Sequence, residues 1–225
     1  MKKLFIVTGE LSGDTHAAAV VEQIRAQDGD IEVEAIAWLN ILWVVCSLPV
    51  FTLGASTAAL CTAVRNMIRE SGHWNSAAFF RAFRDNFKKS TLLWLILLAA
   101  LALLGADVYI LRALFPEQLF WLVLPGVCFA LWLMVFIWAF PLTATFENTL
   151  WNTIKNAVLL GVGYLPRTLL MAVIHLLPVI LFAVSPAAFY GVSVLWLVLL
   201  SAVTCYTDLW LMQKPFAPFL PDEAE

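Results

Sequence analysis

The feature that most limits the fold of this chain is a stretch of 40 residues, from Thr168 to Thr207, without any Asp, Glu, Lys or Arg. A single membrane-spanning helix needs about 20 apolar residues. We therefore expect two spans here, with a turn near Ser185 and Pro186. The rest of the chain is similar, because 62% of its 225 residues are hydrophobic, 13% are charged and the mean hydropathy is +0.88. Soluble globular domains and disordered chains are far more polar.

Three further uncharged stretches are long enough to cross a bilayer: 35–64, 90–106 and 118–146. The sequence thus predicts an all-α polytopic membrane protein with about five transmembrane helices. Six basic residues lie between Arg65 and Lys89. Basic loops stay on the cytoplasmic side, so we expect this segment inside and the amino terminus outside, in a multi-pass protein of the bacterial inner membrane.

Several classes of chemistry find no support in the residues. The net charge of −3 is too small to favour nucleic acid. The four cysteines, Cys46, Cys61, Cys128 and Cys205, lie in apolar stretches and form no C-x-x-C pair, so we interpret them as packing residues. We find no G-x-S-x-G and no H-E-x-x-H, and we predict no catalytic residue, metal or cofactor.

The first apolar stretch contains two features of helix geometry. Pro49 removes a backbone donor and is expected to kink or break the helix. Small residues follow at Gly54, Ala55 and Ala59, with a spacing that lets another helix approach closely. Helix packing is the first interpretation, and a broken helix that shapes a solute site is the alternative.

Residues 74–89 are predicted to form a basic amphipathic helix. Four phenylalanines share one face, while Arg81, Arg84 and Lys88 gather on the opposite one. This pattern favours a helix in the cytoplasmic interface, whose basic side chains contact lipid headgroups of the bilayer. A docking helix for a cytoplasmic partner is the alternative.

A polar stripe is predicted farther along the chain. Asn148, Asn152 and Asn156 follow each other at intervals of four residues. They form either the wetted face of an interfacial helix or, with His175, the contacts of a polar cavity for a sugar or another neutral solute. Asp208 lies near the end of the last predicted span, where we expect it to be solvated at the interface.

Residues 1–36 differ from the rest, with three basic and seven acidic side chains. Their pattern predicts a strand-loop-helix-strand fragment of βαβ type. The segment resembles the amino terminus of the lipid-A-disaccharide synthase family in a loop formed by Gly9, Glu10, Ser12, Gly13 and Asp14. That resemblance implies a glycosyltransferase fragment involved in lipid A biosynthesis as an alternative function, or a chimera with a leader that has no function.

Residues 37–214 resemble a different family. The segments Leu39–Leu60, Phe79–Leu98 and Pro141–Leu170 are similar, in that order, to blocks of the YesL family of small bacterial membrane proteins. The resemblance implies a non-enzymatic accessory or permease-like component of carbohydrate uptake, with a sugar transporter complex as partner. Residues 215–225 are expected to be an acidic, proline-containing tail.

Overall fold

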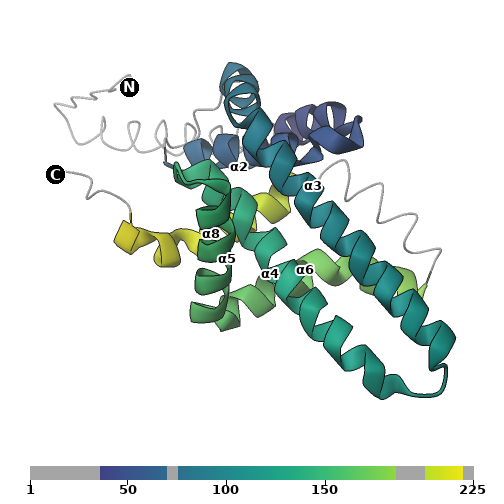
Figure 1. The fold of residues 1–225 in the computed structure, drawn as a ribbon. Helices are drawn as coiled ribbons and strands as arrows, with labels where there is room; N and C mark the ends of the chain where they lie inside the picture. Colours follow the sequence, from purple (N-terminus) through teal and green to yellow (C-terminus); the bar gives the residue numbers. More distant parts are fainter. Residues whose placement is uncertain (1–35, 70–75, 186–200, 220–225) are drawn as a thin grey trace, which may run out of the picture.

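The computed structural model describes residues 36–69, 76–185 and 201–219, and it contains helices and no strand within these ranges. An apolar helix, Ile36–Ser47, comes first. The other elements are η1 (Val50–Thr52), α2 (Leu53–Arg69), α3 (Ser76–Leu114), η2 (Leu119–Leu122), α4 (Val123–Thr145), α5 (Leu150–Gly163), α6 (Leu165–Val184), α8 (Ser201–Phe216) and η4 (Ala217–Phe219) (Figure 1).

The prediction of an all-α membrane protein is confirmed for the described residues. The helix α3 and the stretch Leu119–Thr145 are each long and apolar enough to cross a bilayer. The pair α5 and α6, bent by 106°, supplies a third crossing if it counts as one span. The count of five stays a prediction, because residues 186–200 lie outside the described ranges. The predicted βαβ fragment of residues 1–36 also stays a prediction, because residues 1–35 lie outside the described ranges.

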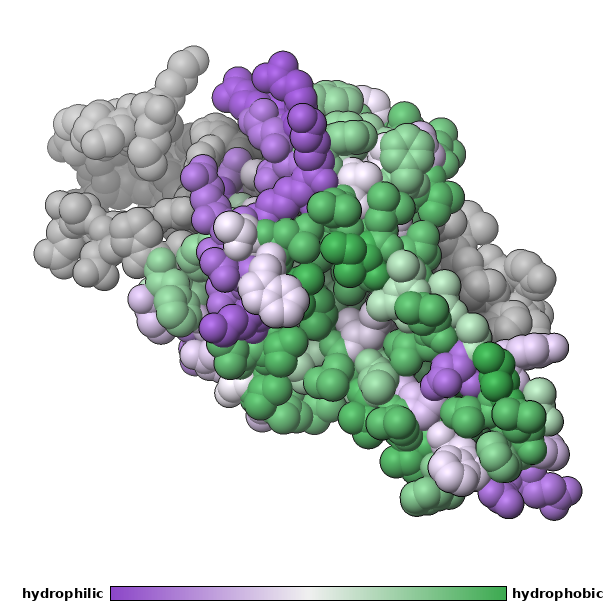
Figure 2. Space-filling model, in the orientation of Figure 1, coloured by the Kyte–Doolittle hydropathy of each residue, from purple (hydrophilic) through white to green (hydrophobic). Residues whose placement is uncertain are grey.

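The helices α3 and α4 form a long hairpin (Figure 1). Large hydrophobic side chains near its tip face outward, including Leu103, Tyr109, Phe120 and Leu124. Figure 2 shows a broad hydrophobic surface over this region, with hydrophilic residues gathered at the end where α3 begins and a few more at the tip of the hairpin. An exposed apolar surface of this extent is what a lipid-facing helix hairpin presents.

The helical structure is interrupted between the first helix and α2, next to Pro49. The helix Ile36–Ser47 ends two residues earlier, and Pro49 precedes η1 in an extended conformation, with φ −75° and ψ 109°. The hydroxyl hydrogen of Thr52 is shared between the carbonyl oxygens of Cys46 and Pro49, each of which lies 2.6 Å from Thr52 Oγ1. Trp94 Nε1 of α3 donates to the Val50 carbonyl over 2.9 Å. A break of this kind is tolerated in a membrane bundle because its backbone groups find partners.

Small residues bring α2 and α3 together. A Cβ added to Gly54 would collide with the Ser90 carbonyl oxygen and with Trp94 Cβ. Ala55 and Ala59 are also fully buried, and they lie on α2 beside the face that carries Gly54. The two backbones are therefore close enough that only a residue without a side chain fits at position 54.

The basic amphipathic segment is continuous with the following span. Since α3 runs from Ser76 to Leu114, no break separates the predicted interfacial helix from the apolar stretch after Lys89. Phe79 is fully buried in the core, whereas Phe80 is 48% exposed. Only part of the predicted phenylalanine face is therefore available to lipid.

The bend between α5 and α6 is held by a short chain of hydrogen bonds. Trp138 Nε1 of α4 donates to Thr168 Oγ1 over 3.0 Å, and Thr168 Oγ1 donates to the Gly161 carbonyl over 2.8 Å. Trp138 itself is fully buried. One threonine thus links α4, α5 and α6.

Candidate functional site

An apolar cavity of about 330 Å³ lies between the first helix, α2, α3, α4, α6 and α8. Its aromatic walls come from three elements, the first helix, α3 and α4, and are formed by Trp43, Trp94, Phe136 and Phe140. Its polar lining comes from Thr57, His175, Ser201, Thr204 and Asp208. An apolar cavity with a few polar groups is the usual composition of a small-molecule site.

Hydrogen bonds to the surrounding helices fix the two tryptophans of the wall. Trp43 Nε1 donates to Thr57 Oγ1 of α2 over 3.1 Å. Trp94 Nε1 is engaged by the Val50 carbonyl at the helix break. Because both indole N–H groups are occupied, the tryptophans contribute their ring carbons to the cavity.

The helix α8 is held in place by polar contacts at both ends. The buried Asn40 Oδ1 accepts a hydrogen bond from the Ala202 backbone N–H over 2.9 Å. Arg167 Nη1 of α6 donates to the Leu211 carbonyl over 3.1 Å. These contacts set the position of α8 against the first helix and α6, and with it the position of Asp208.

His175 and Asp208 form the polar centre of the cavity. His175 Nε2 lies 3.4 Å from Asp208 Oδ2, and the side chains are 20% and 6% exposed. His175 Nδ1 lies 3.0 Å from the Met171 carbonyl. A carbonyl can only accept a hydrogen bond, so Nδ1 carries a hydrogen. Nε2 then faces Oδ2 at 3.4 Å, a separation at which a hydrogen on either atom would lie between the imidazole and the carboxyl group.

One carboxyl oxygen of Asp208 has no hydrogen-bond donor among the described residues. This oxygen, Oδ1, is buried. A buried acceptor without a donor is costly, and ionisable groups at membrane depth are commonly functional. Phe136 packs edge-on against the His175 ring, with centroids 6.0 Å apart and planes at 86°. The site therefore offers a hydrogen-bond acceptor beside aromatic rings.

The expectation that Asp208 is solvated at the interface is wrong. Asp208 belongs to the buried face of α8 together with Cys205, Leu209 and Met212. This face packs into the bundle, so the carboxyl group is carried into the interior. The sequence places Asp208 and His175 33 positions apart, and no local pattern reveals that α6 and α8 bring them together.

The predicted asparagine stripe is divided by the structure. The helix α5 begins at Leu150, so Asn148 precedes it, and Thr149 caps the helix by accepting a hydrogen bond from the Asn152 backbone N–H over 3.3 Å. Asn152 is exposed. Asn148 and Asn156 line a separate cavity of about 430 Å³. The structure thus separates His175 from all three asparagines.

The predicted headgroup contacts lie at the hydrophilic end of α3. Arg81, Arg84 and Lys88 are exposed. Arg81 also lines a polar groove of about 760 Å³, together with Arg65 and Glu147. Arg65 Nη1 donates to the Ala144 carbonyl over 2.6 Å. This bond satisfies a carbonyl in the last turn of α4, where helices lack internal donors.

Two further predictions concern the synthase-like loop and metal binding. The synthase-like loop of Gly9, Glu10, Ser12, Gly13 and Asp14 lies outside the described residues. Within residues 36–69, 76–185 and 201–219, no group of three or more His, Cys, Asp or Glu side chains is arranged to hold a metal ion.

The chain has recognisable relatives in sequence. Residues 36–108 match a family described as "Protein of unknown function, DUF624". The uncharacterized protein YesL of Bacillus subtilis (strain 168) is 30% identical over 175 residues, which cover 73% of this chain and 80% of YesL. No solved structure shows a significant match.

Proposed function

Because this chain belongs to the DUF624 family of YesL-like membrane proteins, we propose that it is a non-enzymatic, permease-like or accessory component that binds a small saccharide. The observation that carries the proposal is the buried carboxyl group of Asp208 beside aromatic rings in an intramembrane cavity. Sugar hydroxyls donate to carboxylates, and the C–H faces of a sugar ring pack on aromatic side chains.

The cavity suits such a ligand in size and in the placement of its polar groups. Its volume of about 330 Å³ is at the lower end of the range for small-molecule sites, roughly 300–1,000 Å³. Asp208 Oδ1 has no donor among the described residues, so a ligand hydroxyl would satisfy it. Thr57 and His175, on other walls, supply further polar contacts.

The proposal includes a placement in the membrane. The chain crosses the bacterial inner membrane five times, with the segment from Arg65 to Lys89 on the cytoplasmic side. Its six basic residues support this orientation. Arg81, Arg84 and Lys88 contact anionic headgroups there. A sugar transporter complex in the same membrane is the proposed partner.

The test is saccharide binding to the full chain in detergent, measured as a shift of the melting temperature with a panel of neutral sugars. We expect one saccharide to raise the melting temperature in a dose-dependent way. Asp208→Asn should weaken binding about two- to tenfold, because the amide presents an NH₂ group in place of one carboxyl oxygen and a hydrogen bond contributes about 0.5–1.5 kcal/mol. Asp107→Asn is the matched control, since Asp107 is exposed on α3.

Three results would count against this function or against its assignment to the cavity. If no saccharide shifts the melting curve, the cavity is not a sugar site. If a sugar binds equally well to wild type and to Asp208→Asn, binding occurs elsewhere and the assignment of the cavity is wrong. Equal weakening in Asp107→Asn would indicate a general electrostatic effect and would also remove the assignment.

Glycosyl transfer is a second proposal, and the resemblance of residues 1–36 to the synthase family supports it. The residues of its synthase-like loop, from Gly9 to Asp14, lie outside both the described ranges and the family match at 36–108. Incubation of the full chain with acylated sugar donors tests it. Formation of a disaccharide that Asp14→Asn abolishes would establish the activity, and absence of product would refute it.

A further inference from the structure

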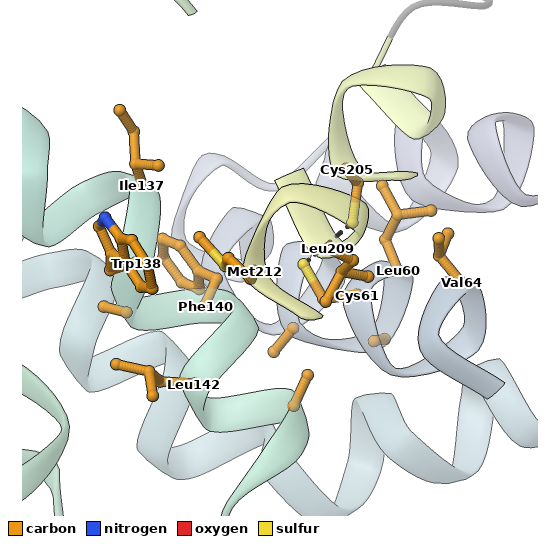
Figure 3. Close-up of a cluster of buried hydrophobic side chains, with 14 of the residues drawn as sticks. Leu60, Cys61, Val64, Ile137, Trp138, Phe140, Leu142, Cys205, Leu209 and Met212 are labelled. Atoms are coloured by element: carbon orange, nitrogen blue, oxygen red, sulfur yellow. Dashed lines mark hydrogen bonds between the residues drawn. The ribbon is translucent and has the colours of Figure 1, made fainter. Parts of the chain in front are cut away.

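Two cysteines that are remote in sequence meet inside the bundle. Cys205 Sγ of α8 donates a hydrogen bond to Cys61 Sγ of α2 over 3.1 Å, as the dashed line in Figure 3 shows. Their exposed fractions are 7% and 3%, and both thiols are free. The sequence has no C-x-x-C motif, so the packing of α2 on α8 is what creates this dithiol.

The surroundings of the dithiol separate it from bulk water but not from the cavity. Leu60 and Leu209 lie beside the two sulfur atoms in Figure 3, and both are buried. Cys61 and Cys205 also line the cavity of about 330 Å³. A small uncharged oxidant in this cavity would therefore be next to the sulfurs, whereas a large or charged reagent in water would not.

We propose that Cys61 and Cys205 form a reversible disulfide that ties α2 to α8 at the cavity wall. Each thiol loses its proton, one S–S bond forms, and two electrons leave the sulfurs. A membrane-dissolved quinone accepts the two electrons and the two protons and becomes the quinol. A dithiol reductant reverses the reaction by thiol–disulfide exchange.

The disulfide would act on the cavity through the geometry of two helices. Asp208 follows Cys205 by three residues, so the two side chains lie on the same face of α8. Thr57 precedes Cys61 by four residues and shares its face of α2. Joining the sulfurs fixes the separation of these two walls, and with it the position of the Asp208 carboxyl group relative to Thr57.

The test uses the full chain in detergent without any saccharide, so its outcome does not depend on the proposed function. Cys46 and Cys128, which are half-buried, are changed to serine to leave the pair alone. The probe is duroquinone, whose fully substituted ring resists addition of a thiol. We expect the intact mass to fall by two hydrogens and maleimide labelling after denaturation to disappear. Dithiothreitol should restore both.

Peptide mapping of the unaltered chain keeps the test valid if the serine variant folds poorly. The expected product is a cross-linked peptide pair containing Cys61 and Cys205. Persistence of both thiols after duroquinone treatment would overturn the proposal. A disulfide between two molecules, seen as a dimer on a non-reducing gel, would overturn it too.

The melting temperature tests whether the disulfide joins α2 to α8. A cross-link that closes a long loop constrains the unfolded chain, so oxidation should raise the melting temperature of the pair-containing protein by several degrees. Cys61→Ser and Cys205→Ser in the same background cannot form the bond and should show no shift. An equal rise in either single variant would show that the pair does not join α2 to α8.

Discussion

At the scale of single residues, the absence of one carbon atom decides how α2 meets α3. The space that a Cβ at Gly54 would need is occupied by the Ser90 carbonyl oxygen and by Trp94 Cβ. Neither atom is the end of a flexible side chain, so the helices themselves would have to move apart. Trp94 also lines the cavity, which makes this contact important for the site.

Gly54→Ala should therefore destabilise the protein by about 1–3 kcal/mol, the usual cost of overpacking a core. The measurement is the melting temperature of the full chain in detergent. Gly105→Ala is the matched control on α3, since a Cβ there would have no atom within 4 Å. That control should be neutral or gain up to about 1 kcal/mol. Equal melting temperatures for both variants would contradict the close approach of α2 and α3.

Single residues also show how far sequence reasoning about the cavity reaches. His175 stands out because it is a titratable group in a long uncharged stretch, and the structure places it in the cavity. Asp208 was expected at the interface and is buried instead. Depth along a span can be read from the sequence, but the face that a helix turns toward its neighbours depends on tertiary packing.

At the scale of elements, the bend between α5 and α6 depends on polar contacts in an apolar setting. Thr168 Oγ1 accepts from Trp138 Nε1 and donates to the Gly161 carbonyl. Gly161 is also tightly packed, because a Cβ there would collide with the side chain of Met134 on α4. The three helices α4, α5 and α6 thus meet where one hydroxyl satisfies two buried groups.

Thr168→Val should destabilise the protein by about 1–3 kcal/mol, because it leaves a buried indole N–H without an acceptor. Thr207→Val is the control, since Thr207 Oγ1 donates over 2.9 Å to the Val203 carbonyl of its own helix in an exposed setting. The thermal unfolding of both variants is compared in the same detergent. If the two substitutions cost the same, the hydrogen-bond chain does not hold the bend.

Element boundaries were predictable where backbone chemistry determines them. The first helix ends near Pro49, and α6 ends at Val184, just before Ser185, where the sequence predicts a turn. The continuity of α3 through Lys89 could not be predicted. The change from basic to apolar residues after Lys89 marks a change of environment, and it does not require the helical backbone to end. The asparagine periodicity begins before the helix itself, since Thr149 caps α5 after Asn148.

At the scale of the whole molecule, the described helices and the matched family both begin at residue 36. The charge distribution changes at the same place in the sequence. The cavity, the dithiol and the α3–α4 hairpin are all built from residues after this point. We therefore expect membrane integration to depend on this part of the chain.

Deletion of residues 2–34 should leave integration unchanged, as measured by resistance to alkaline carbonate extraction and protease protection of a carboxy-terminal tag. Deletion of residues 90–106, the apolar part of α3, is the comparison and should alter protection of the tag, because it removes one crossing. If the first deletion makes the protein extractable by carbonate, residues 2–34 are needed for insertion and the division of the chain at residue 36 is wrong.

Because α3 is uninterrupted, a tilt of its apolar part also moves its basic end. Its 39 residues extend about 58 Å, roughly twice the thickness of the hydrocarbon core of a bilayer. The part before Ser90 continues the apolar part as one rigid rod of about 21 Å. Transmembrane helices adjust to bilayer thickness by tilting, and a change of about 20° would displace the basic end sideways by about 7 Å. The thickness of the surrounding membrane thus affects where the basic end of α3 lies along the membrane surface.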